Sequence, residues 1–450
     1  MENNTPKREL SRDLKARHVQ MIAIGGVIGT GLFLGSGSAI HKAGPSLILA
    51  YILAGLFGYL MMRAVGELLL SNIKVRSFID FVRIYLGDRW EFAIGWAYWL
   101  AWLSLAMADL TATGIYLRFW FPFLPQWITP LIVVIILVGL NLFNVRWFGE
   151  LESGFASIKV AAIIALIVIG IGMILTHFHT GGHTASVSNL VNHGGFFATG
   201  WKGFVLAFPM VIFAFTGIEM VGLTAGETED PKRDLPKAIK LVPVRIAIFY
   251  VGAIAVIMAI FPWNQINTEQ SPFVQVFAGL GISFAASIIN FVVLTAALSA
   301  ANSAIFSTSR TLYILAKNSQ APKQLAYVSK NLVPTTGMLA SAAILLLVVL
   351  MNYFFPSSVF ELISGVANTS FIFVWLLIMF AHIKYRSTVT DLNKVFFKMP
   401  WFPATSFLTI GFYIFVLIVL ILSPETTISV IATIIFFILM LAGRSLWMKK

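Results

Sequence analysis

The 450-residue chain has no cysteine and few charged residues, and both shortages limit what it can be. The lack of cysteine excludes disulfides, thiolate metal sites and cysteine nucleophiles. Charged residues make up only 11% of the chain and hydrophobic residues 58%, whereas about a quarter of the residues of a soluble globular domain are charged. This composition is typical of an integral membrane protein.

Apolar windows of about 20 residues, the length that crosses a bilayer as a helix, recur along the whole chain. They predict twelve spanning helices, at 18–40, 46–70, 88–117, 128–144, 153–176, 200–222, 243–262, 274–302, 336–354, 359–382, 402–422 and 427–443. The runs are continuous, unlike the short alternating segments of a membrane barrel. The charged amino-terminal stretch is followed by a full span without a small-residue cleavage site, so no cleaved signal peptide is predicted. Because the connecting loops are short, function is expected inside the helix bundle.

Acidic residues are scarcer than basic ones, 19 against 31, which gives a net charge of +12. If the amino terminus is cytoplasmic, the predicted topology leaves only Lys42, Arg118 and Lys202 on the outside among the loop cations. This bias follows the positive-inside rule and predicts a multi-pass cell-membrane protein with both termini in the cytoplasm. The basic balance is explained by topology, so no nucleic-acid partner is expected.

Glycine is concentrated in the first predicted span, in "GGVIGTGLFLGSG" from Gly25 to Gly37. A glycine costs about 1 kcal/mol relative to alanine inside a helix. The sixth span also has small and polar residues at its middle, in "FAFTGIEMVG" from Phe213 to Gly222. Paired interruptions in two inverted halves indicate a transporter's midplane site, where helix ends offer N–H groups to a carboxylate and carbonyls to an ammonium group. Close helix packing is the alternative explanation of the glycines.

Several ordered motifs resemble the amino acid permeases of the amino acid–polyamine–organocation superfamily. They are "RELSRDLKARHVQMIAIGGVIGTGLFLGSG", "AGPSLILAY", "MRAVGELLLSN", "FAFTGIEMVGLTAGETEDPKRDLPKAI", "SPFVQVF" and "NFVVLTAALSAANSAIFSTSRTLYILA". Within that family, "SFIDF", "GWAYWLAW", "MADLTATGIYLRFWFP" and "SPFVQVF" are most similar to permeases for D-serine, D-alanine and glycine. Lysine, proline, aromatic amino acid and 4-aminobutyrate permeases share much of the pattern and stay as alternatives.

The resemblance implies an all-α membrane fold of the leucine-transporter type, with helices 1 and 6 broken. The first repeat would cover 18–176, an inverted second repeat 200–382, and two further helices 402–443, between cytoplasmic tails at 1–17 and 444–450. The implied function is symport of a small amino acid with a proton, by alternating access. Neither a cofactor nor an obligate protein partner is expected, and the surroundings are the lipid bilayer.

The resemblance also implies where the substrate binds. Gly29, Thr30 and Gly31 would bind its carboxylate through backbone N–H groups and the Thr30 hydroxyl. Phe213 or Phe215 would close over it as an aromatic gate, with ordinary packing as the alternative. The carbonyls of Val27, Phe213 and Thr216 would bind the amine. The expected substrate site comprises Val27, Gly29, Thr30, Gly31, Phe213, Phe215, Thr216, Gly217 and Asp109.

Charged residues inside predicted spans are functional candidates because burying a charge in hydrocarbon is costly. By family resemblance, Lys159 would carry the coupled proton at the place of a sodium ion, and snorkelling to the interface is its alternative. Glu219 and Glu67 are further proton candidates. Their alternatives are a hydrogen-bonded helix anchor for Glu219 and a structural salt bridge with Arg63 for Glu67. Asp109 has a structural interpretation and a functional one, in which it biases the charge or size of the substrate or pairs with the protonation network.

The eighth span adds three polar residues whose oxygens would face the coupling site, or otherwise join helices. They are Ser299, Asn302 and Ser303. The side-chain room of the substrate site would depend partly on the tenth span, at Ile363–Ser370.

Two other functions compete with transport. A membrane enzyme usually gathers nucleophiles, bases or metal ligands at one face, and no HExxH or GxSxG motif occurs here. A sensor that binds an amino acid without moving it usually adds a long soluble extension. The histidines between His177 and His193 lie in a loop rich in Gly, Ser and Thr, which favours a solvated loop over a zinc site. The chain is therefore predicted to be a transporter, with no enzymatic activity and no metal.

Overall fold

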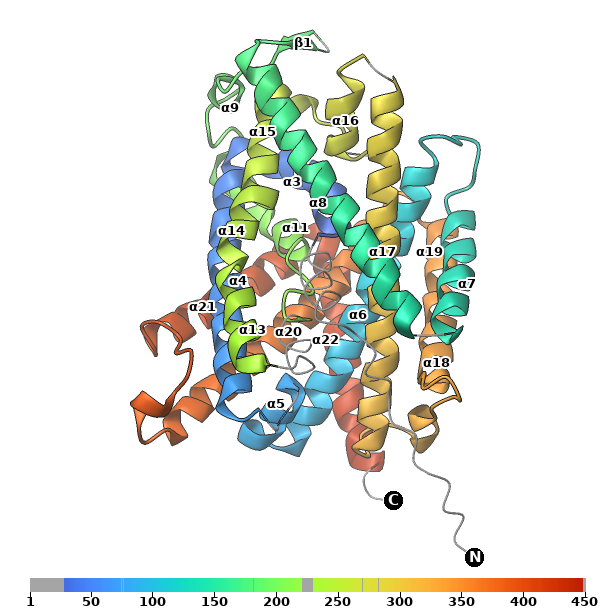
Figure 1. Ribbon diagram of the computed structural model, residues 1–450, viewed down its shortest axis with the longest axis vertical. Helices are drawn as coiled ribbons and strands as arrows, with labels where there is room; N and C mark the ends of the chain where they lie inside the picture. Colours follow the sequence, from blue (N-terminus) through green and yellow to red (C-terminus); the bar gives the residue numbers. More distant parts are fainter. Residues whose placement is uncertain are drawn as a thin grey trace, which may run out of the picture.

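The computed structural model describes residues 28–73, 75, 77–143, 145–180, 182–220, 230–268, 270–281 and 283–447. These residues form a bundle of long helices aligned mainly with the long axis of the molecule (Figure 1). Within the described ranges, nine helical segments are long and apolar enough to cross a membrane, and Ile128–Leu142 and Gly200–Phe213 are shorter apolar helices. The protein is an all-helical membrane protein, as the sequence predicts.

The first part of the chain forms the helices coloured blue to green in Figure 1. They are α2 (Thr30–Phe33), α3 (Gly35–Ala43), η1 (Gly44–Ser46), α4 (Leu47–Ser71), α5 (Phe78–Leu86), α6 (Asp88–Leu117), α7 (Ile128–Phe143), α8 (Val145–Leu175) and α9 (Asn189–Asn192). A small antiparallel hairpin of β1 (His179–Thr180) and β2 (His183–Thr184) follows α8 at the upper end of the bundle.

The second part of the chain contains more short helices. They are α10 (Gly200–Leu206), α11 (Phe208–Phe213), α13 (Pro231–Lys240), α14 (Val242–Ile246), η2 (Ala247–Gly252), α15 (Ala253–Ile260), η3 (Trp263–Gln265), α16 (Pro272–Ala278), α17 (Ser283–Lys317), η4 (Lys323–Ala326), α18 (Thr335–Leu345), α19 (Leu347–Phe354), α20 (Val359–Thr388), η5 (Leu392–Lys394), α21 (Ala404–Leu422) and α22 (Pro424–Trp447). The segment η2 is a π-helix, a form that occurs frequently at functional sites.

Most long helices begin and end near the predicted positions, and α6 has the predicted bounds. The prediction for the eighth span, 274–302, is wrong at both ends. Its first residues belong to the separate helix α16, which a turn at Gly279–Gly281 disconnects from α17, and Gly281 has a φ of +73°. At the other end α17 continues to Lys317 through a polar stretch that a hydropathy window does not include.

The centre of the bundle is formed by α6, α17 and α20. The most apolar windows of α6 and α20 are each 83% buried, whereas the corresponding window of α22 is 22% buried. Helices α6 and α20 therefore pack inside the protein. Helix α22 lies at its periphery, where its apolar side chains face lipid. Small residues permit close approach at several crossings. A Cβ on Gly95 of α6, for example, would lie 2.4 Å from a methyl carbon of Leu315 on α17.

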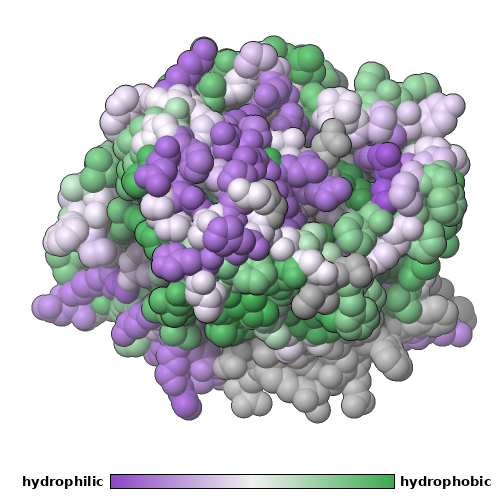
Figure 2. Space-filling view, turned by 90° about the horizontal axis from the view of Figure 1, so that it is seen from above, coloured by the Kyte–Doolittle hydropathy of each residue, from purple (hydrophilic) through white to green (hydrophobic). Residues whose placement is uncertain are grey.

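Polar residues collect at the ends of the bundle. Seen from the upper end, hydrophilic side chains gather over the middle and hydrophobic ones lie toward the sides (Figure 2). Helices near the lower end begin with side-chain caps. Ser77 accepts a hydrogen bond from the Ile79 N–H at the start of α5, and Asp230 accepts one from the Arg233 N–H at the start of α13. This distribution fits a bundle whose two ends meet water.

Candidate functional site

The helix of the first predicted span begins abruptly at Thr30 within the described residues. Gly29 precedes it with extended backbone angles, φ −124° and ψ −161°. The four residues of α2 then continue, after Leu34, into α3. The first N–H groups of a helix have no acceptor within it, so they are available to other groups. Val27, which was predicted to contribute a carbonyl, lies outside the described residues.

The sixth predicted span is interrupted in its middle. Helix α11 ends at Phe213, and the residues from Ala214 to Glu219 form turns. Gly217 has a φ of +87°, a conformation that favours glycine. The Thr216 hydroxyl donates a hydrogen bond of 2.7 Å to the Phe213 carbonyl. This confirms that the small and polar residues of "FAFTGIEMVG" coincide with a helix end.

The start of α2 and the end of α11 touch at Gly31. A Cβ added to this glycine would lie 2.7 Å from the Ala214 Cα and 3.0 Å from the Phe213 carbonyl oxygen. Such a contact is with backbone atoms, which cannot rotate away. Gly35 packs similarly closely, against the Met210 side chain of α11. Both glycines therefore permit close helix packing, which brings the start of α2 and the end of α11 together.

Asp109, on the buried helix α6, joins this junction. The Thr30 hydroxyl donates a hydrogen bond of 2.7 Å to the Asp109 Oδ1 atom, and both side chains are buried. Two predicted site residues that lie 79 positions apart thus meet directly. Because Thr30 is the first residue of α2, the contact fixes the start of the helix against α6.

The side walls near the junction are aromatic. Tyr250, in the π-helical segment η2, donates a hydrogen bond of 2.9 Å to the Ala214 carbonyl. Its ring stacks on Phe215 with centroids 5.0 Å apart. Phe213 meets Phe360 of α20 edge to face at 5.7 Å. The two predicted gate residues therefore face different partners, Phe215 toward η2 and Phe213 toward the first turn of α20.

Two further contacts connect the interrupted sixth span to α20. The Trp375 indole donates a hydrogen bond of 3.0 Å to the Glu219 carboxylate, which is fully buried. The Asn368 amide donates one of 2.8 Å to the Pro209 carbonyl. Glu219 thus has the contact expected of a helix anchor beside the interruption. Asn368 belongs to the stretch Ile363–Ser370 that was predicted to contribute to the site.

Lys159 of α8 is fully buried, so its side chain does not reach the membrane surface by snorkelling. Helix α8 packs against α17, which carries the three predicted polar residues Ser299, Asn302 and Ser303, all of them buried. The Asn302 amide oxygen accepts a hydrogen bond of 2.6 Å from Asn141 of α7. Asn302 therefore joins two helices, which is the structural role that its alternative interpretation described.

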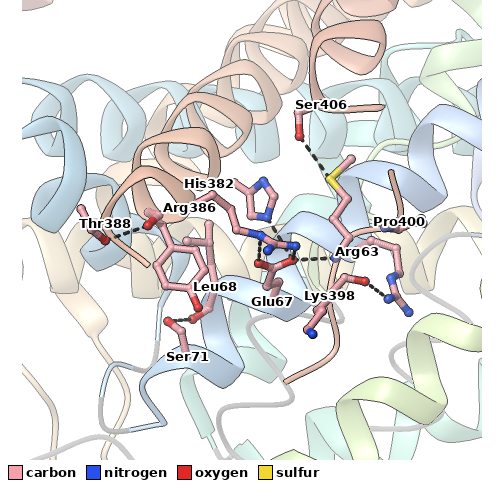
Figure 3. A network of polar contacts seen from close by, with 12 residues as sticks. Arg63, Glu67, Leu68, Ser71, His382, Arg386, Thr388, Lys398, Pro400 and Ser406 are labelled. Atoms are coloured by element: carbon pink, nitrogen blue, oxygen red, sulfur yellow. Dashed lines mark hydrogen bonds and ion pairs between the residues drawn. The ribbon is translucent and has the colours of Figure 1, made fainter. Parts of the chain in front are cut away.

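Glu67 lies elsewhere, near the lower end of the bundle, in a charged cluster (Figure 3). Its carboxylate forms an ion pair with Arg386 of α20, lies 3.3 Å from the His382 Nε2 atom and accepts a hydrogen bond of 2.6 Å from the Met399 N–H. Arg63 does not provide the ion pair that its spacing suggested. Its guanidinium lies over the Phe397 ring and donates a hydrogen bond to the Lys398 carbonyl.

Several of these partners carry no local signal in the sequence. Tyr250, Trp375 and Asn141 are ordinary residues of apolar helices until the tertiary contact is known. Arg386 was attributed only to the charge bias of the loops, although its position one helical turn after His382 near the end of a span could have marked the pair. In the hairpin of β1 and β2, His179 contacts the Thr184 hydroxyl at 3.0 Å.

These features are those of a multi-pass membrane protein. The start of α2 and the end of α11 meet in its buried centre. The amino acid permease family model matches residues 18–450. Relatives include an amino-acid permease, AapA, of Bacillus subtilis (strain 168), 53% identical over 98% of this chain and 96% of the relative. The D-serine/D-alanine/glycine transporter of Escherichia coli (strain K12) is 45% identical over 96% of this chain and 93% of the relative. The probable threonine/serine transporter YbxG of Bacillus subtilis (strain 168) is 44% identical over 96% of this chain and 94% of the relative.

The chain belongs to the amino acid permease family. It is accordingly a membrane transporter of amino acids and not an enzyme.

Proposed function

We propose that the chain is a proton-coupled symporter that imports a small amino acid by alternating access. D-Serine, D-alanine and glycine are the preferred substrates of this proposal. The observation that carries it is the meeting of both helix interruptions at Gly31, with Thr30 bonded to Asp109. The similarity to a D-serine/D-alanine/glycine transporter over nearly the whole chain supports the choice of substrates.

The proposed architecture is a five-plus-five inverted repeat with two additional helices, twelve spans in all. Residues 18–176 form the first repeat, 200–382 the second, and 402–443 the last two helices. The helix start at Thr30 and the helix end at Phe213 touch each other and lie in the first predicted span of each repeat, which supports this division. Rocking of the repeats around the junction would expose it to each side in turn.

In the proposed complex, the substrate carboxylate binds the N–H groups of Gly29, Thr30 and Gly31. Its ammonium group binds the carbonyls of Val27, Phe213 and Thr216. Because Phe213's carbonyl already accepts the Thr216 hydroxyl, the substrate amine would have to exchange with or share this bond. The Thr30 hydroxyl similarly has Asp109 as its acceptor, so a bound carboxylate would compete with Asp109 for it.

We assign the coupled proton to Lys159 and Glu219. Both are fully buried, and the Trp375 indole donates a hydrogen bond to the Glu219 carboxylate. Ionisable groups inside membrane-spanning segments are typical of proton pathways in transporters. Glu67 is less suited, because its carboxylate already pairs with Arg386 and accepts the Met399 N–H. Its geometry supports the structural alternative.

The proposed location is the cell membrane with both termini in the cytoplasm. The lower end of the bundle in Figure 1 would then face the cytoplasm, since α5, α13 and the end of α20 lie there. Basic side chains at these positions, such as Arg89, Lys240 and Lys384, support this orientation.

Another amino acid is the main alternative substrate. The similarity to a probable threonine/serine transporter favours a small hydroxylated L-amino acid as the second candidate. Proline, lysine, aromatic amino acids and 4-aminobutyrate follow. A sensor that binds without transport is a further alternative.

Reconstituted liposomes test the proposal directly. Radiolabelled glycine uptake is measured with and without an inward proton gradient, in competition with all common L- and D-amino acids. We expect gradient-driven uptake that D-alanine and D-serine block. Uptake of a different amino acid would assign the chain to another branch of the family. Binding without uptake would favour the sensor.

The role of Lys159 is tested with Lys159→Ala in the same liposomes. We expect uptake to lose its response to the proton gradient while exchange of internal for external substrate continues. Equal gradient dependence in the variant and the native protein would remove Lys159 from the coupling mechanism.

A further inference from the structure

A groove of about 440 Å³ lies on the side of the bundle, and its lining residues are not those of the helix junction. It is bounded by the end of α5, the first turn of α6 and the last four turns of α20. Apolar side chains, including Leu86, Trp90, Phe373 and Phe380, form most of its lining. Its size and composition suit a hydrocarbon chain.

The polar part of the groove is confined to one end. Lys384 and Ser387 line it there, in the last turns of α20, which ends at Thr388. The apolar lining extends back along α20 to Phe373, and eleven residues of helix rise about 16 Å. The groove is therefore amphiphilic along its length, with a long apolar section and a polar terminus.

The terminus of the groove lies where a lipid headgroup is expected. Trp90, 40% exposed in the first turn of α6, has the position typical of a tryptophan at the membrane–water interface. Lys384 is exposed and is the one charged residue among the described residues that line the groove. The opposite charges of Asp88 and Arg89, next to Trp90, cancel each other. The ammonium group of Lys384 therefore makes the polar end of the groove positive.

A second groove offers a comparison within the same molecule. It is larger, about 670 Å³, and lies between α4 and α21. Its lining includes Phe57, Phe407, Leu408 and Phe412 and is apolar throughout. Acyl chains can cover such a surface without any selection of headgroup. The cationic terminus distinguishes the α20 groove from ordinary lipid-facing surface.

We infer that the α20 groove binds an anionic glycerophospholipid, with an acyl chain along Phe373–Phe380 and its phosphate at Lys384 and Ser387. The apolar section supplies hydrophobic contact, and the ammonium group of Lys384 supplies the preference for negative charge. This site is independent of the proposed substrate, because it requires only that the bundle is embedded in a bilayer.

Native mass spectrometry of the purified full-length protein tests the site. Phosphatidylglycerol and phosphatidylcholine with identical acyl chains are titrated in competition, and the bound lipids are counted. One basic residue near a membrane surface attracts an anionic lipid with a free energy of about 1 kcal/mol. We therefore expect phosphatidylglycerol to bind about fivefold more tightly than phosphatidylcholine. Lys384→Ala should abolish this preference, because the phosphatidylglycerol affinity falls more than that of phosphatidylcholine, whose choline group offsets its phosphate charge.

Lys240→Ala is the matched control, since Lys240 is an exposed lysine at the end of α13 and outside the groove. It should preserve the preference. Equal binding of both lipids to the native protein, or a preference that survives Lys384→Ala, would overturn the inference. An equal loss in Lys240→Ala would also overturn it, because the general surface charge would then be responsible.

Two groove-filling variants and one soluble competitor distinguish a bound lipid from a bound phosphate compound without acyl chains. Leu376→Trp fills the α20 groove and should weaken both lipids, whereas Leu408→Trp fills the second groove and should leave the headgroup preference intact. Glycerol 3-phosphate, which has the phosphate without acyl chains, should not displace phosphatidylglycerol at millimolar concentration. Displacement would show a soluble-phosphate site and contradict the assignment of a lipid.

Discussion

Glu67 and Asp109 are both fully buried carboxylates, yet their surroundings differ. Glu67 lies against Arg386 and His382, and it also accepts a backbone N–H (Figure 3). Asp109 accepts the hydroxyl hydrogen of Thr30, the first residue of an interrupted helix. The first carboxylate links α4 to α20 and to the segment before α21, and the second holds one side of the helix junction.

The different surroundings indicate different roles, stability for Glu67 and transport for Asp109. A buried carboxylate beside a buried arginine cannot lose its partner without leaving an uncompensated charge. A hydrogen bond from a hydroxyl contributes about 0.5–1.5 kcal/mol and can be exchanged for one to a ligand. We therefore expect changes at the Glu67 cluster to affect folding and changes at the junction to affect transport.

The largest effect is predicted for Arg386→Ala. The change leaves Glu67 buried without its ion pair, which costs about 3–5 kcal/mol in comparable cases. We expect most of the protein to be lost as aggregate, measured as the monodisperse fraction in size-exclusion chromatography and the melting temperature in detergent.

The double variant Glu67→Leu with Arg386→Met is its control. Replacing a buried ion pair by apolar residues is often neutral, so the double variant should recover much of the folded fraction. A folded Arg386→Ala protein with normal melting and lost uptake would contradict the comparison and return Glu67 to the transport mechanism.

The next effect is predicted for Gly31→Leu, at the junction. Its Cβ would meet the Ala214 Cα at 2.7 Å, so the two helix interruptions must separate. Overpacking costs about 1–3 kcal/mol, and a cost of this size at the transport step corresponds to about a 5- to 150-fold loss of uptake per folded protein. Gly29→Ala is the control, since its Cβ would lie 3.7 Å from the Ala300 Cβ, an ordinary contact. If Gly31→Leu keeps normal uptake, the contact is unimportant for transport.

A smaller effect is predicted for Thr30→Val, which keeps the shape of the side chain and removes the donor to Asp109. The loss of one hydrogen bond should lower uptake by about two- to tenfold, with little change in melting temperature. Thr30→Ser retains the hydroxyl and should retain uptake. A melting temperature that falls as far in Thr30→Val as in Arg386→Ala would remove the distinction between the two carboxylates.

The sequence was sufficient for features that depend on local composition. Twenty-residue apolar windows indicated the long helices, and α6 has the predicted bounds because apolar residues fill it between Gly87 and Arg118. The glycines and small residues of two spans predicted helix breaks, and among the described residues a helix begins at Thr30 and another ends at Phe213. The cost of burying a charge marked Asp109 as a candidate, but its contact with Thr30 was not predicted.

The rest depends on contacts between distant segments, which have no signature in one sequence. Arg63 has the right spacing to pair with Glu67, but Arg386 approaches the carboxylate from another helix, and Arg63 packs on Phe397 instead. Tyr250 reaches the Ala214 carbonyl from a π-helical segment that hydropathy cannot distinguish from an α-helix. Helix register in three dimensions decides such pairs.

The smallest effect is predicted for an ion pair that lacks burial. Lys42 of α3 pairs with Glu425 at the start of α22, and the two side chains are 28% and 46% exposed. Water and salt screen this pair, so Lys42→Ala should change the free energy of unfolding by less than about 1 kcal/mol. Melting measured at low and high salt checks this. A large, salt-independent loss would mean that Lys42 holds α3 to α22 as firmly as Arg386 holds α20 to Glu67, and burial would no longer explain the difference between the two ion pairs.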